Sequence, residues 1–283
     1  MSRLALVLAF GLACHQLLAA PAQQSPSEQG LHERLAQVRN CVVAVARIDT
    51  AGGIARIVAT HGTAFHIGTG GHALTAKHVI AGKPKGLVAL TMEEAGGWTW
   101  TPVVASELHP SEDVAIIKLE SGACRSGFPL SSAVELASSR YRTYAYPGQA
   151  TRLEIAKGEF PDLVYTEGYI RRRYSASVYP STGSSSPAGA ARVDGTAFFE
   201  LSQVAGPGTS GGPVFDLADP LTVIGIYSAE KHVPQFINAD GKQIVQLTSV
   251  AYAVRDEAFR DWKPAMLGGR TVFEQSRPAR VGR

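Results

Sequence analysis

The sequence predicts an all-β fold made of two packed antiparallel barrels. From position 41 onward, apolar residues alternate with polar ones or come in short runs, which is typical of β-strands. Glycine and proline, 29 and 16 of the 283 residues, separate these segments as turns. Neither half contains the long helices that would connect parallel strands. Two antiparallel barrels therefore fit the pattern better than an α/β arrangement.

The expected strands fall into two series. The first series comprises residues 41–47, 53–61, 62–67, 72–75, 86–92, 98–106 and 114–119. The second series comprises residues 142–146, 152–158, 163–169, 195–201, 213–215, 221–228 and 247–254. We expect one folded unit over 41–262, with barrel one at about 41–120, a linker at 121–140 and barrel two at about 141–254.

Helices are expected only at the ends of this unit. Leu31, Leu35 and Val38 stand at helical spacing and predict a lead-in helix within residues 23–40. A closing helix is expected over 255–262, with Ala258 and Phe259 facing inward. Residues 263–283 are basic and poorly patterned, and we assign them to a tail.

The N-terminus has the pattern of a secretory signal peptide. Arg3 precedes an apolar stretch from Leu4 to Ala13, and Ala20-Pro21-Ala22 offers a cleavage site, so we expect a signal peptide over 1–22. The stretch is too short for a membrane anchor, which needs about 20 apolar residues. We expect an exported protein, periplasmic or secreted. The formal net charge of +3 requires neither nucleic acid nor a membrane as a partner.

Two cysteines remain after removal of this segment, Cys41 and Cys124. In an exported protein such a pair could form one disulfide. Two buried and inert thiols are the other interpretation.

Three segments carry residues with the chemistry of a nucleophilic hydrolase. Ser210 is flanked by glycines in GPGTSGGP (206–213), where the backbone can direct N–H groups at a developing oxyanion. His78 follows the apolar strand LTA, and Asp113 precedes another apolar strand. A serine nucleophile needs a base, and the base needs a group that orients it. The order His, Asp, Ser supplies all three.

These segments resemble the trypsin-like serine peptidases, specifically the bacterial branch with HtrA-type protease domains and glutamyl endopeptidases. The blocks that carry the resemblance are GTAFHIG (62–68) with LTAKHV (74–79), DVAIIKL (113–119), GTSGGP (208–213) and VIGIYS (223–228). The similarity covers roughly residues 41–255. It implies a chymotrypsin-like fold with two six-stranded barrels and, because the chain ends soon after barrel two, no PDZ domain.

The resemblance also implies the roles of individual residues. Ser210 would be the nucleophile, His78 the general base, and Asp113 the residue that orients the histidine. The N–H groups of Gly208 and Ser210 would form the oxyanion hole. No metal or cofactor is expected, and the substrate would be a polypeptide.

The specificity pocket is expected to be apolar. The resemblance implies that this pocket is lined by residues shortly before the nucleophile and by the strand after it, here Val204, Ala205, Tyr227, Ser228 and Ala229. A floor without a buried counter-charge makes a charged side chain costly to desolvate. We therefore expect cleavage after small or medium apolar residues. A catalytically silent binding protein on the same fold and an esterase with the same triad are the alternatives.

Overall fold

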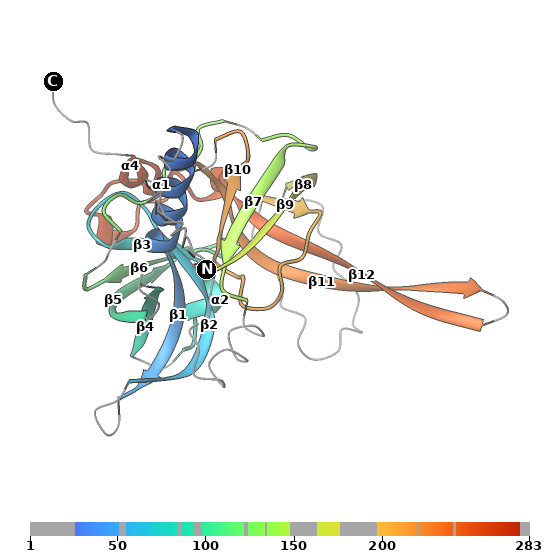
Figure 1. The fold of residues 1–283 in the computed structure, drawn as a ribbon, viewed down its shortest axis with the longest axis horizontal. Helices are drawn as coiled ribbons and strands as arrows, with labels where there is room; N and C mark the ends of the chain where they lie inside the picture. Colours follow the sequence, from blue (N-terminus) through green and yellow to red (C-terminus); the bar gives the residue numbers. More distant parts are fainter. Residues whose placement is uncertain are drawn as a thin grey trace, which may run out of the picture.

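The computed structural model describes residues 26–50, 55–83, 86–92, 98–121, 124–133, 135–147, 163–175, 197–219, 221–239 and 242–277. Within these residues, the strands form two closed, six-stranded antiparallel barrels that lie side by side (Figure 1). The predicted chymotrypsin-like fold is thus confirmed.

Barrel one is built from the first series of predicted strands. Its strands are β1 (Val42–Asp49), β2 (Arg56–His66), β3 (His72–Thr75), β4 (Leu87–Met92), β5 (Trp98–Leu108) and β6 (Ala115–Leu119). They are joined in the order β1-β2-β3-β6-β5-β4, and β1 pairs with β4 to close the barrel. The two strands expected at 53–61 and 62–67 are one continuous strand, β2, because Gly62 continues the extended backbone and does not form a turn.

Barrel two has the same strand order as barrel one when each barrel is read from its first strand. Its strands are β7 (Arg140–Ala145), β8 (Val164–Ser175), β9 (Ala197–Leu201), β10 (Pro213–Asp216), β11 (Val223–Ala239) and β12 (Lys242–Arg255), in the order β10-β11-β12-β9-β8-β7. The strand expected at 152–158 lies outside the described residues. β11 continues far beyond the predicted end at residue 228, and β12 begins before the predicted start at residue 247.

The helices are short apart from the first one. They are α1 (Pro26–Cys41), α2 (Lys77–Ile80) and α4 (Val272–Ser276), with 3-10 turns η3 (Asp256–Ala258) and η4 (Ala265–Leu267). α1 corresponds to the predicted lead-in helix. The closing helix expected over 255–262 is a single 3-10 turn, after which Phe259 is buried. No helix in the described part of the chain is long and apolar enough to cross a membrane.

Residues beyond 262 also belong to the packed structure. Leu267 and Val272 are buried in the core, and α4 begins with a capping box between Thr271 and Glu274. The Gln275 side chain donates a hydrogen bond to the carbonyl of Thr69 in barrel one (2.7 Å). The segment assigned to a basic tail is therefore folded up to residue 277, and only 278–283 lie outside the described residues.

An aromatic cluster joins the two barrels. Phe65 of β2 and Phe215 of β10 both pack on Phe128 of the linker, with ring centroids 6.5 Å and 4.9 Å apart. All three side chains are fully buried. Burying one such side chain contributes about 2–3 kcal/mol. The linker thus takes part in the core that holds one barrel against the other.

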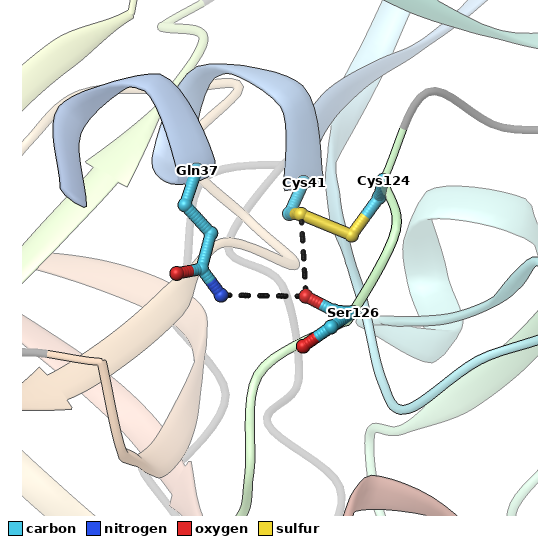
Figure 2. Close-up of a disulfide and its surroundings, with 4 residues drawn as sticks. All are labelled: Gln37, Cys41, Cys124 and Ser126. Carbon is cyan, nitrogen blue, oxygen red and sulfur yellow. Dashed lines mark hydrogen bonds between the residues drawn. A yellow bond between two sulfur atoms is a disulfide. The ribbon is translucent and has the colours of Figure 1, made fainter. Parts of the chain in front are cut away.

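A disulfide between Cys41 and Cys124 ties the end of α1 to the linker, which confirms the predicted pairing (Figure 2). Beside it, the Gln37 side-chain amide donates to the carbonyl of Ser126 (3.3 Å). The bridge spans 83 residues of sequence and encloses all of barrel one. Such a cross-link reduces the conformational freedom of the unfolded chain.

Candidate active site

His78 and Asp113 lie at adjacent strand ends of barrel one. β3 pairs with β6, with Thr75 opposite Ala115, so α2 after β3 lies beside the turn before β6. The His78 backbone N–H donates to Asp113 Oδ1 (3.0 Å), and the ring Nδ1 lies 2.8 Å from Oδ2. A carboxylate at Nδ1 selects the tautomer that carries its proton there, which leaves Nε2 as a proton acceptor.

Ser210 lies in the tight turn between β9 and β10. Gly206, Gly208 and Gly211 in this turn have φ of +94°, +99° and +88°, which favour glycine. A Cβ on Gly211 would come within 2.0 Å of the Thr63 carbonyl oxygen, so the turn is pressed against β2. The Thr63 N–H donates to the Ser210 carbonyl (2.8 Å). Barrel one therefore fixes the position of the serine turn.

Ser228 of β11 connects the serine to the aspartate. Its hydroxyl donates to Asp113 Oδ2 (2.5 Å), and its carbonyl accepts a hydrogen bond from Ser210 Oγ (3.0 Å). Ser228 was predicted to line the specificity pocket, and this stays a prediction; the sequence did not indicate the contact of its side chain with the aspartate. Between the described residues there is no hydrogen bond from Ser210 Oγ to His78, because the serine hydroxyl is bonded to Ser228.

The N–H groups of Gly208 and Ser210 are available for a ligand. In the part of the chain that the structure describes, neither donates a hydrogen bond to the protein. The Gly208 carbonyl accepts a hydrogen bond from the Thr63 hydroxyl (3.0 Å). That hydroxyl also accepts from the Tyr146 N–H of barrel two (3.1 Å). Thr63 therefore connects the serine turn to both barrels.

Three of the predicted pocket residues, Val204, Ala205 and Tyr227, lie close to one another in barrel two. Val204 and Ala205 pack against the barrel-two core that contains Tyr227. The Ala205 N–H donates to the Tyr227 hydroxyl (3.1 Å), which donates to Glu230 Oε1 (2.7 Å). Burial, and then the charge of Glu230, raises the pKa of Tyr227 and keeps its phenol protonated.

The carboxylate of Glu230, which the sequence indicated as a residue that could narrow or edge the pocket, accepts two hydrogen bonds. The Gly206 N–H donates to Oε1 of Glu230 (2.7 Å), the same oxygen that accepts from Tyr227. The segment at 205–206 is thus tied to β11. Nothing in the sequence indicates this contact, because it depends on how close the segment at 205–206 lies to β11 in the folded protein.

Comparisons with known proteins place the chain among peptidases. The family model described as a trypsin-like peptidase domain matches residues 62–226. No curated protein matches the sequence. Among solved structures, the active form of the Rv3671c protease from M. tuberculosis is 16% identical, with 98% of both chains covered and a TM-score of 0.52.

Two further solved structures are similar to this chain. The MamO protease domain from Magnetospirillum magneticum is 16% identical over 79% of this chain and 95% of that one, with a TM-score of 0.51. The HtrA-type protease AlgW, solved with a decapeptide, is 15% identical over 79% of this chain and 63% of that one, with a TM-score of 0.50. At these identities the likeness shows a shared fold.

Proposed function

Since the chain belongs to the trypsin-like peptidase family and is a serine endopeptidase, we propose that it hydrolyses peptide bonds through an acyl-enzyme on Ser210. The observation that carries this proposal is a chain of hydrogen bonds. His78 Nδ1 bonds to Asp113, the Ser228 hydroxyl donates to Asp113, and the Ser210 hydroxyl donates to the Ser228 carbonyl. It supports a nucleophile, a base and an orienting carboxylate at the junction of the two barrels.

In the proposed mechanism, substrate binding replaces the bond from Ser210 Oγ to Ser228 with one to His78 Nε2. Such catalytic hydrogen bonds often form only when substrate is bound. His78 removes the serine proton as Oγ attacks the carbonyl carbon of the peptide bond. The imidazolium that forms is stabilised by Asp113 at Nδ1. His78 then gives the proton to the leaving amine, and a water molecule repeats the sequence on the acyl-enzyme.

The N–H groups of Gly208 and Ser210 would stabilise the negative oxygen of each tetrahedral intermediate. Among the described residues, neither N–H group donates a hydrogen bond to the protein, so neither has to break such a bond before it donates to the oxyanion. Gly208 has a positive φ, and its carbonyl accepts a hydrogen bond from the Thr63 hydroxyl. Thr63 is thus a positioning residue for this hole.

We further propose that cleavage follows small or medium apolar residues. Val204 and Ala205 are partly buried apolar residues, Ala229 is buried, and Glu230 Oε1 already accepts hydrogen bonds from Tyr227 and Gly206. A carboxylate held by two donors is a weaker partner for an incoming cation than a free one. Profiling with a peptide library tests this assignment, and dominant cleavage after Arg, Lys or Glu would overturn it while leaving the mechanism intact.

Export of the enzyme is part of the proposal. It is supported by the signal-peptide pattern of residues 1–22, and by the Cys41–Cys124 disulfide, since such bonds persist in oxidising compartments. The substrate is then a polypeptide outside the cytoplasm. Sequencing the N-terminus of the exported protein tests the cleavage site expected after Ala22.

The mechanism is tested with a Ser210→Ala variant and a fluorophosphonate probe. We expect labelling of the wild type at Ser210, none of the variant, and a fall in peptide turnover of roughly 10⁴–10⁶-fold. Comparing peptide with simple ester substrates separates a peptidase from an esterase. A variant that retained a tenth of wild-type turnover would show that Ser210 is not the nucleophile. A wild type that binds peptides without cleaving them would be a silent binding protein.

A further inference from the structure

The turn that carries Asp113 contains a histidine that the proposed mechanism does not use. This turn runs from His109 to Val114, between β5 and β6, and the His109 N–H donates to the Val114 carbonyl (2.9 Å). At its base, Leu108 of β5 pairs with Ala115 of β6. Asp113 therefore lies inside a closed turn whose two ends are fixed by barrel one.

The ring of His109 accepts hydrogen bonds from the backbone of the same turn. Its Nδ1 accepts from the Glu112 N–H (2.9 Å) and from the Ser111 N–H (3.3 Å). Glu112 is only 2% exposed, so its N–H needs an acceptor within the protein. Because Glu112 directly precedes Asp113, this bond fixes the backbone one residue before the aspartate.

His109 accepts these bonds only while Nδ1 carries no proton. Two N–H donors face this nitrogen, so the ring proton belongs on Nε2. Burial lowers the pKa of His109 below its ordinary 6.5, while the charge of Glu112 raises it and that of Lys77 lowers it by smaller amounts. The ring is therefore uncharged at neutral pH and can act as an acceptor.

The segment that follows β12 contacts both the ring and the residues just before it. Trp262 meets the His109 ring edge to face, with ring centroids 5.0 Å apart and an angle of 74° between the planes. The N–H groups of Ala265 and Met266 donate to the two carboxylate oxygens of Glu107 (3.0 and 3.3 Å). The start of the turn is thus held from a distant part of the sequence.

We propose that His109 is a positioning residue for catalysis, because its Nδ1 holds the turn that places the Asp113 carboxylate against His78. The inference rests on the proposed function, in which Asp113 orients the histidine base. Asp113 Oδ1 and Oδ2 lie 3.0 and 2.8 Å from the backbone nitrogen and ring Nδ1 of His78. Both contacts depend on where the turn holds the carboxylate. A misplacement of about 1 Å can reduce a rate about 100-fold.

Two substitutions at position 109 separate the acceptor from the ring. Asparagine carries its oxygen on Cγ, where histidine carries Nδ1, and it commonly accepts a backbone N–H two residues further on. Leucine places a methyl group at the same point and accepts no hydrogen bond. Both substitutions remove the ring that packs on Trp262. The acceptor is therefore the main difference between His109→Asn and His109→Leu.

Steady-state kinetics on a peptide substrate give the first measurement. We expect kcat of His109→Leu to fall about 10- to 100-fold with KM within about twofold, since the change displaces the orienting carboxylate and not the substrate. We expect His109→Asn to keep kcat within about threefold of the wild type, because the acceptor is restored. The same kcat in both variants, whether lowered or not, would overturn the inference.

A measurement without turnover separates the inference from the proposed function. In the Ser210→Ala background, NMR can observe the proton on His78 Nδ1, whose resonance lies far downfield while it is bonded to Asp113. We expect this resonance to be kept when His109→Asn is added and to be lost or shifted upfield when His109→Leu is added. Circular dichroism checks folding, and His109→Ala, which also lacks an acceptor, takes the place of His109→Leu if that variant does not fold.

The two measurements fail in different ways. If the wild type cleaves no peptide, the proposed function fails, and the His78 resonance then decides the inference by itself. A resonance that is unchanged in both variants would show that the Nδ1 acceptor of His109 does not position Asp113.

Discussion

Barrel one and barrel two have the same strand order but differ in how far their strands extend. The longest strands of barrel one, β2 and β5, have 11 residues, whereas β11 and β12 of barrel two have 17 and 14. Barrel one holds His78 and Asp113 together and is enclosed by a disulfide. Barrel two carries Ser210 and a strand that leaves the barrel. In the proposed function, the enclosed barrel supplies the general base and its orienting carboxylate, and the extended barrel supplies the nucleophile.

The largest expected effect comes from Asp113→Asn in barrel one. An amide can donate to His78 Nδ1 and so stabilise the wrong tautomer, and we expect kcat to fall by roughly 10⁴-fold. Steady-state kinetics on a peptide substrate measure this. Asp219→Asn, at an exposed position of barrel two, is the matched control. If Asp113→Asn kept kcat within tenfold of the wild type, this result would contradict the proposal that barrel one supplies the carboxylate that orients His78.

The second prediction concerns the disulfide that encloses barrel one. Replacing Cys41 and Cys124 by serine should lower the free energy of unfolding by about 4 kcal/mol, the cost expected for a bridge spanning 83 residues. Urea denaturation in the Ser210→Ala background, which avoids self-cleavage, measures the loss. Reduction of the parent should reproduce it and leave the serine variant unaffected. Equal stability of parent and variant would mean that the bridge does not strengthen barrel one.

The third prediction uses a buried histidine of the same barrel. Burial, and then the charge of His72, lowers the pKa of His66 from 6.5 to about 4. Between these values the unfolded chain binds a proton that the folded protein does not, so stability falls as pH decreases. At pH 5 the loss should be about 2 kcal/mol relative to pH 7.

This pH dependence is measured by urea denaturation at both pH values. His66→Gln removes the titrating group and should reduce the loss, whereas His61→Gln, at a less buried position, should reduce it less. An unchanged acid sensitivity in His66→Gln would show that the instability arises elsewhere than in barrel one.

The smallest effect is expected at Ser228, where the two barrels meet. Ser228→Ala removes the hydrogen bond to Asp113 but leaves both bonds from Asp113 to His78. We expect kcat to fall about tenfold with KM nearly unchanged, since one charge-assisted hydrogen bond is lost. A change confined to KM would assign Ser228 to substrate binding, as the sequence alone suggested.

The sequence predicted the barrels well because their strands follow a simple apolar pattern. β3 was placed at its observed ends, and β1, β4, β5 and β6 within a few residues. The segments of His78, Asp113 and Ser210 were recognised from their blocks, and the structure brings these three side chains into one region. Their roles remain predictions.

The features that the sequence missed depend on contacts between distant segments. Ser228 is the last residue of the strand predicted at 221–228, and nothing local shows that its hydroxyl reaches Asp113, 115 positions earlier. The sequence predicted that this strand ends at residue 228. Beyond that point, Lys231 and Pro234 interrupt the apolar pattern. A strand with one free edge tolerates such residues, since it needs neither two buried faces nor every N–H.

The hydrogen bond from Gln275 to Thr69 has a consequence for the order of synthesis. A chain that leaves the ribosome or a translocation channel from its N-terminus exposes the strands of barrel one first, yet the groups that cover its end come some 200 positions later (separation 206). Contacts so distant in sequence form late in folding. The finished form of barrel one therefore requires the chain through residue 275, which is synthesised long after the strands of that barrel.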